Sequence, residues 1–141
     1  MPTRILVPMD DSDMAQHALR FAFEHFSEPE VTVLHVVGTP SSMLGSATGF
    51  ALEDDLEAAA DEAAEQVFDL ADTIAAEYDQ SVDTSAQVGH PVRAILNAAE
   101  SGDFDTLVIG THSGSLADRL FIGNVTEKIV RQSPIPVTVA R

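Results

Sequence analysis

Apolar residues recur along the chain with two different periods, which predict strands that alternate with helices. Residues 4–9, 31–37 and 106–109 are short runs that are apolar on both faces, as is typical of strands buried in a parallel sheet. Residues 82–88 alternate apolar with small polar side chains, which indicates a strand nearer an edge. Residues 136–140, after Pro134, form a last extended run. The pattern therefore predicts five strands.

Between these strands the apolar spacing changes to that of a helix. Helices are expected after Asp13, over about residues 53–78, over residues 93–100 and from Asn124 onward. Residues 28–30 are predicted as a turn, and Pro91 suits the first turn of a helix. The predicted core-facing positions are Ala15, Ala18, Leu19, Ala22, Phe23 and Phe26, then Leu56, Ala60, Ala63, Val67, Leu70, Ala71 and Ile74, then Ile95, Leu96 and Ala99, and finally Val125, Ile129 and Val130.

The alternating order of strands and helices predicts an α/β fold. About four helices on a five-stranded parallel sheet form a three-layer sandwich, and right-handed crossovers leave few topologies. The length of 141 residues fits one domain over residues 1–141. Residues 38–49 are too long for an ordinary connection, and loops of this length are often functional.

The segment from Gly110 to Thr126 has the layout of a phosphate-binding loop. A buried strand leads into a Gly/Ser-rich loop, and a helix start follows. Backbone N–H groups in such a loop can point at one anion, and the helix N-terminus adds about half a positive charge. Asn124 is a good N-cap, and Glu127 would complete a capping box. The alternative is a well-capped connection that binds nothing, since the loop matches no Walker motif.

Composition narrows the classes of partner. The formal charge is −16, with 23 acidic residues against 7 basic ones. Nucleic acids and acidic membrane surfaces are therefore not expected as partners.

No apolar run approaches the roughly 18 residues of a membrane span, and the chain starts directly with a strand, so we expect a cytoplasmic protein. Scarce lysine with abundant acid indicates a halophile, the alternative being an acidic mesophilic protein. Cysteine is absent, which excludes disulfides and thiolate sites.

Residues 107–141 resemble the ATP-binding branch of the universal stress protein family. That branch carries Gly-x2-Gly-x9-Gly-Ser/Thr after its fourth strand, and then a Pro-x-Pro-Val strand. Gly110 and Gly123 match the first and third glycines, and residues 134–137 match the closing strand. Ser113 replaces the second glycine and Asn124 replaces Ser/Thr. Residues 5–10 and 33–37 also match, so the resemblance covers nearly the whole chain.

The resemblance implies strand order 3-2-1-4-5 in a fold like that of the adenine nucleotide alpha hydrolases. In such a sheet ligands bind where the strand order reverses, outside the carboxyl ends of the first and fourth strands. Asp10 would accept hydrogen bonds from ribose or adenine. The alternative is an N-cap shared with Asp11 and Ser12, and the two roles are compatible. Val36 would pack on adenine, or else belong to the core. The implied site comprises Pro8, Met9, Asp10, Val36, Ile109, Gly110, Ser113, Gly123, Asn124, Val125 and Thr126.

The chemistry expected at this site is binding, with slow turnover or none. The sequence has no Gly-x-Ser-x-Gly elbow, so a hydrolase triad is not expected, and it has no histidine pair with metal-ligand spacing. Contacts from Arg119 to phosphate or from His112 to a ligand are the less favoured interpretations. The implied ligand is ATP, or AMP or ADP, with Mg²⁺ arriving on the phosphates.

Two other functions stay open. The chain could be a dimeric interaction protein that binds no nucleotide, as the departures at Ser113 and Asn124 allow, or a phosphotransferase or slow ATPase. The resemblance also implies a homodimer through the closing strand, residues 136–140, since an unpaired apolar edge tends to find a partner.

Overall fold

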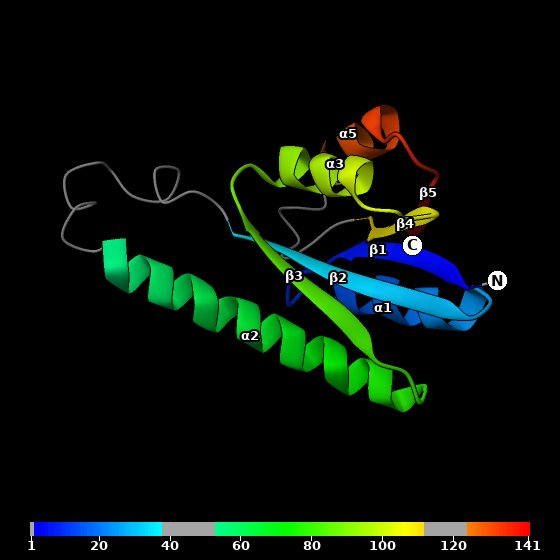
Figure 1. Cartoon of the computed structure of the whole chain (residues 1–141), viewed down its shortest axis with the longest axis horizontal. Helices are drawn as coiled ribbons and strands as arrows, with labels where there is room; N and C mark the ends of the chain where they lie inside the picture. The colour runs from blue at the N-terminus through cyan, green and yellow to red at the C-terminus, as the bar shows by residue number, and fades with distance from the viewer. Residues whose placement is uncertain (1, 38–52, 112–123) are drawn as a thin grey trace.

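A five-stranded parallel sheet forms the centre of the computed structural model, which describes residues 2–37, 53–111 and 124–141 (Figure 1). The strands are β1 (Thr3–Pro8), β2 (Pro29–Val37), β3 (Val82–Val88), β4 (Thr106–Gly110) and β5 (Val137–Ala140). Their order is β3-β2-β1-β4-β5, so the predicted order 3-2-1-4-5 is confirmed. The order reverses between β1 and β4, which makes this pair the switch point of the sheet.

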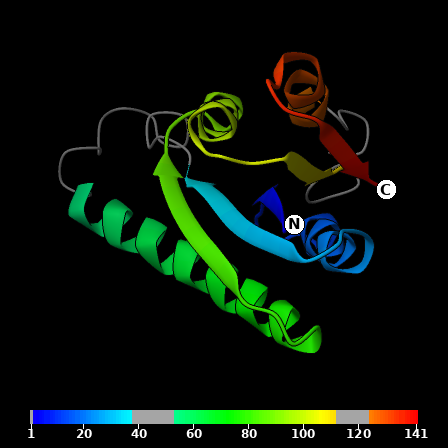
Figure 2. The same cartoon turned by 45° about the vertical axis from the view of Figure 1, so that its right-hand side comes forward.

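Two described helices cover each face of the sheet (Figures 1 and 2). On one face α1 (Asp13–His25) and α2 (Glu53–Glu77) enclose a core of small and branched residues with Ile5, Val7 and Val33 from the sheet. On the other face α3 (Pro91–Ser101) and α5 (Asn124–Gln132) pack on Leu6 and Leu107. The two cores bury both faces of the central strands, as their continuous apolar runs require.

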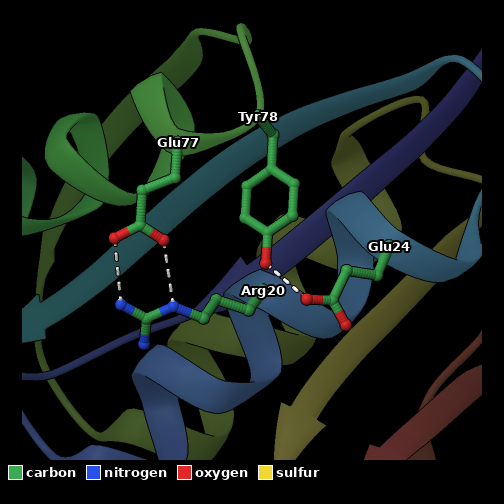
Figure 3. A network of polar contacts seen from close by, with 4 residues as sticks. All are labelled: Arg20, Glu24, Glu77 and Tyr78. Atoms are coloured by element: carbon green, nitrogen blue, oxygen red, sulfur yellow. Dashed lines mark hydrogen bonds and ion pairs between the residues drawn. The ribbon is translucent and has the colours of Figure 1, made fainter.

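Polar contacts join the ends of α1 and α2 (Figure 3). Arg20 Nε lies 3.3 Å from Glu77 Oε2, and the Tyr78 hydroxyl donates to Glu24 Oε1 at 2.5 Å. The hydrogen bond to Glu24 raises the pKa of Tyr78, because the carboxylate favours the protonated phenol. The hydrogen bond to Glu77 likewise raises the pKa of Arg20. The Tyr78 ring also stacks on Phe23, so this network lies directly over the core.

The edge strand β5 is attached to the rest of the fold at both ends. The carbonyl oxygen of Pro136 accepts from Leu107 N at 2.9 Å and from the Thr106 hydroxyl at 3.0 Å. At the other end the carbonyl of Arg141 lies 2.9 Å from His17 Nε2 on α1. All three hydrogen bonds come from within the same chain.

Several local predictions need correction. In α2 the buried alanine is Ala64, whereas Ala63 is exposed and its prediction as a core residue is wrong. Residues 28–30 are not simply a turn, because Pro29 already pairs with Thr3 as the first residue of β2. The helix predicted from residue 93 begins at Pro91. On α5, Val125 and Val130 are exposed, so of its three predicted core positions only Ile129 is buried.

Candidate functional site

The strands β1 and β4 separate toward their carboxyl ends, and this opens the switch point. Their pairing is confined to Ile5 with Thr106 and Leu6 with Leu107. Even-numbered residues of β1 direct their backbone N–H and C=O groups toward β4, as the hydrogen bond from Asp105 N to Arg4 O demonstrates. Pro8 is the next such position beyond the paired region, and a proline has no N–H to donate to a ladder. Beyond Pro8 the structure brings Met9 and Asp10 to the opening.

Asp10 forms a turn and keeps one carboxylate oxygen available. Its Oδ1 accepts from Ser12 N at 2.9 Å, while the Ser12 hydroxyl accepts from Ala15 N at 3.2 Å and is the N-cap of α1. Of the three residues in the predicted shared N-cap, Ser12 caps α1, whereas Asp10 does not and instead accepts from Ser12 N. Among the described residues nothing donates to Asp10 Oδ2. This oxygen can accept a hydrogen bond from a ligand at the switch point.

Gly110 ends β4 in close contact with α1. A Cβ atom at this position would lie 2.8 Å from the carbonyl oxygen of Met14 and 3.1 Å from its carbonyl carbon. Only glycine lets the first turn of α1 approach the strand this closely. We expected glycine here for the approach of phosphates, and the structure adds a packing reason that sequence reasoning missed.

Thr126 links the start of α5 to the end of β4. Its hydroxyl donates to the carbonyl oxygen of Gly110 at 2.9 Å, and the residue is 9% exposed. Sequence reasoning assigned Thr126 only a backbone N–H. The side-chain bond was missed because its partner lies 16 positions away in sequence. It fixes the first turn of α5 at the same strand end that Ile109 and Gly110 form.

His35 contacts the carboxyl end of β1 from the neighbouring strand. Its Nδ1 lies 2.9 Å from the carbonyl oxygen of Met9. A carbonyl can only accept, so Nδ1 carries the proton. In the sequence His35 was one of five scattered histidines with no assigned role. From the sequence, only its place on β2, directly after the buried Leu34, could have indicated that His35 lies near the strand ends.

The backbone of Val36 faces the space beyond Met9. Met9 N donates to Leu34 O at 2.8 Å, so even-numbered residues of β2 direct their N–H and C=O groups toward β1. The β1–β2 register ends at Pro8 with Leu34, and Val36 N donates to no described residue. The Val36 side chain is half-buried against the core under α3 and α5.

The remaining predicted site residues lie at or beyond the limit of the described structure. Ser113 and Gly123, together with Arg119 and His112, fall outside the described residues. Asn124 is the first residue of α5, and its side chain is also outside them. Glu127 Oε1 lies 2.8 Å from Arg131 Nη2, so this carboxylate pairs within α5. Val125, in the first turn of α5, is 42% exposed.

A separate hollow lies away from the switch point. It has a volume of about 220 Å³ and is bordered by the end of β3 and one side of α3, including His90, Arg93 and Asn97. None of its described lining residues belongs to β1 or β4. Within the described residues no three His, Asp or Glu side chains are grouped to hold a metal ion. No helix in those parts of the chain is long and apolar enough to cross a bilayer.

The family model described as the universal stress protein family matches residues 1–141. The chain belongs to the universal stress protein family. Universal stress protein YxiE of Bacillus subtilis is 29% identical over 150 aligned residues, which cover all of both chains. Universal stress protein MJ0531 of Methanocaldococcus jannaschii is 27% identical over 144 residues, which cover 98% of this chain and 81% of that protein.

Solved structures of universal stress proteins share the same fold. The structure of the MJ0577 protein of Methanocaldococcus jannaschii has a TM-score of 0.78 at 26% identity and covers 98% of this chain and 94% of that one. Universal stress protein UspA from Lactobacillus plantarum has a TM-score of 0.73 at 28% identity, with 99% and 97% covered. The resemblance read from the sequence is thereby confirmed for family and fold.

Proposed function

We propose that this universal stress protein binds ATP, or AMP or ADP, as a regulatory ligand at the switch point between β1 and β4. The observation that carries the proposal is the free backbone edge of Val36, one residue past His35 on β2. Its N–H donor and C=O acceptor both face the space where β1 has ended. Adenine offers an acceptor at N1 beside a donor at its 6-amino group, which complements that edge.

The ribose would be held by Asp10. A carboxylate at the end of a strand in a doubly wound sheet is suited to accept hydrogen bonds from ribose hydroxyls. Asp10 Oδ2 accepts nothing from the described residues, while Oδ1 is used by Ser12 N. One oxygen therefore keeps the turn in place, and the other is available to the ligand.

The phosphates would lie between the end of β4 and the start of α5. Backbone N–H groups in the first turn of a helix favour anions, and here Thr126 holds that turn against Gly110. Glu127, the acidic residue of that turn, is paired with Arg131, which reduces its repulsion of a phosphate. Mg²⁺ would enter with the phosphates, since it commonly binds through substrate phosphates and water.

More distant relatives of the same fold have been solved with adenine nucleotides. One universal stress protein structure is in complex with cAMP, one from Arabidopsis thaliana has AMP bound, and one from Archaeoglobus fulgidus is in complex with dAMP. Their identities to this chain are 22%, 17% and 23%, which establishes the shared fold alone. They support the proposal only in that the fold accommodates this class of ligand.

The second candidate function is a dimeric interaction protein that binds no nucleotide. The specific observation in its favour is β5, an edge strand whose Val137, Thr138 and Val139 are all half-buried. The departures at Ser113 and Asn124 from the family's loop motif also favour it. A homodimer through β5 is compatible with both candidates.

Two measurements separate the candidates. Mass spectrometry of small molecules released from the denatured protein is expected to detect an adenine nucleotide. Titration calorimetry in molar salt is expected to give ATP binding that falls about tenfold in Asp10→Asn, which retains the oxygen for Ser12 N but loses the second acceptor. Asp11→Asn is the matched control and should bind as the wild type does, because only the Asp11 backbone carbonyl has a described contact, from Gln16. A wild-type protein that releases no nucleotide and binds none would favour the second candidate.

A further inference from the structure

The ladder between β1 and β2 stops one hydrogen bond earlier than its geometry requires. In a parallel pair, a residue that donates to one partner residue accepts from the residue two positions further on. Met9 N donates to Leu34 O at 2.8 Å, so Met9 O is placed by register to accept from Val36 N. That bond is absent among the described residues, and Met9 O is instead 2.9 Å from His35 Nδ1.

We infer that His35 is a positioning residue for the base of the bound nucleotide. By holding the Met9 carbonyl, its imidazole keeps the Val36 N–H out of the ladder and free to donate to adenine N1. The inference rests on the proposed nucleotide function and assigns its base selectivity. Guanine presents a donor at N1 and an acceptor at O6, the reverse of the pattern on adenine, so donor would meet donor at Val36 N–H. An available Val36 N–H would therefore favour adenine over guanine.

The chemistry of the contact supports this role. Met9 is 4% exposed and His35 is half-buried, so a carbonyl there without a donor would be costly. Two donors compete for it: the Val36 amide through the ladder, and the imidazole through the side chain. Since the neutral tautomer with Nδ1–H and the imidazolium both donate from Nδ1, the contact persists in either protonation state.

Two substitutions separate positioning from simple packing. His35→Leu fills a similar space with no donor, so the Val36 amide should close onto Met9 O. His35→Asn is the matched control, because its amide nitrogen is attached to Cγ as Nδ1 is and can still donate. By calorimetry we expect His35→Leu to bind ATP about tenfold more weakly, the typical effect of losing one hydrogen bond, with a reduced preference for ATP over GTP. His35→Asn should retain both properties.

Hydrogen exchange of the Val36 amide tests the inference without any nucleotide. Followed by NMR, this amide should exchange readily in the wild type and in His35→Asn, and should be protected in His35→Leu. If all three proteins exchange it alike, the positioning role is overturned even if ATP binds. If the wild type binds no nucleotide but the exchange pattern holds, the proposed function fails while the structural role of His35 stands. A folded His35→Leu with wild-type affinity and wild-type preference for ATP would also overturn the inference.

Discussion

The hydroxyl of Thr126 donates a hydrogen bond to the carbonyl oxygen of Gly110 at 2.9 Å. This single contact joins the first turn of α5 to the last residue of β4, so the two elements that border the proposed phosphate site are held at a fixed separation. Because Thr126 is 9% exposed, little water competes for the bond. The geometry of the proposed phosphate site thus depends in part on the Thr126 side chain, even where that side chain does not touch the ligand.

Replacing Thr126 by valine should weaken both stability and binding. Thr126→Val keeps the shape but removes the donor, and a hydrogen bond of this kind contributes about 1 kcal/mol to the free energy of unfolding. We expect that loss in urea denaturation, together with weaker ATP binding because the turn is no longer fixed. Thr126→Ser is the control and should recover most of both. Equal stability in the valine variant would show that the bond contributes nothing.

Gly110→Ala should destabilise the fold through α1. Its Cβ would meet the backbone carbonyl of Met14 at 2.8 Å, and relief of such overpacking typically costs 1–3 kcal/mol. Thermal unfolding should therefore show a lowered midpoint even without nucleotide. Shortening the neighbouring side chain by Met14→Ala should not rescue the variant, because the obstructing atom belongs to the backbone. A rescue would mean that the side chain, not the carbonyl, is the obstacle.

Tyr78 should ionise at an unusually high pH. Its hydrogen bond to Glu24 raises its pKa above the ordinary value of 10.0. Since the pKa of Tyr78 is raised in the folded state, the stabilisation that its hydrogen bond to Glu24 gives the fold is fully present below pH 10. It is lost as the pH rises through the pKa of Tyr78 in the folded state. Tyr78 is the only tyrosine and tryptophan is absent, so phenolate absorbance reports this group alone. Glu24→Gln should lower the pH midpoint of the Tyr78 titration, whereas Glu62→Gln, elsewhere on the surface, should leave that midpoint unchanged.

The proposed dimer depends on the outward-facing backbone of β5. Leu107 N donates to Pro136 O, so residues 136, 138 and 140 face β4, and Val139 directs its N–H away from the sheet. Val139→Pro removes that donor without breaking a ladder bond and should yield a monomer in sedimentation velocity in molar salt. Ala86→Pro makes the corresponding change at the free edge of β3 and should leave the dimer intact. A dimer that survives Val139→Pro but not Ala86→Pro would use the opposite edge.

Nucleotide affinity should first rise and then fall as salt is added. ATP and a chain of formal charge −16 repel each other at long range, and screening removes this repulsion before it weakens the close contacts. Calorimetric titrations across a potassium chloride series would reveal the maximum. A steady decline from low salt upward, with circular dichroism unchanged, would contradict this expectation.

The sequence predicted the sheet more reliably than the contacts within it. Continuous apolar runs identified β1, β2 and β4 because burial on both faces leaves no other pattern. The choice of Ala63 over Ala64 failed because a long alanine-rich helix offers several equally apolar stripes, and only packing decides among them. The partners of His35 and Thr126 could not be predicted, since each side chain bonds a backbone carbonyl of another element. Ser113 and Gly123 remain predictions from the motif alone.

The two hydrogen bonds that the Pro136 carbonyl accepts have a consequence for the proposed dimer. Leu107 N and the Thr106 hydroxyl both bond that carbonyl, His17 bonds the carbonyl of Arg141, and β5 pairs with β4 between them, so the strand is held within its own chain. In the proposed dimer, two such preformed edges would meet as rigid bodies, without folding coupled to binding. The unfolding midpoint of the isolated protomer would then be well defined, and dilution would separate two folded subunits.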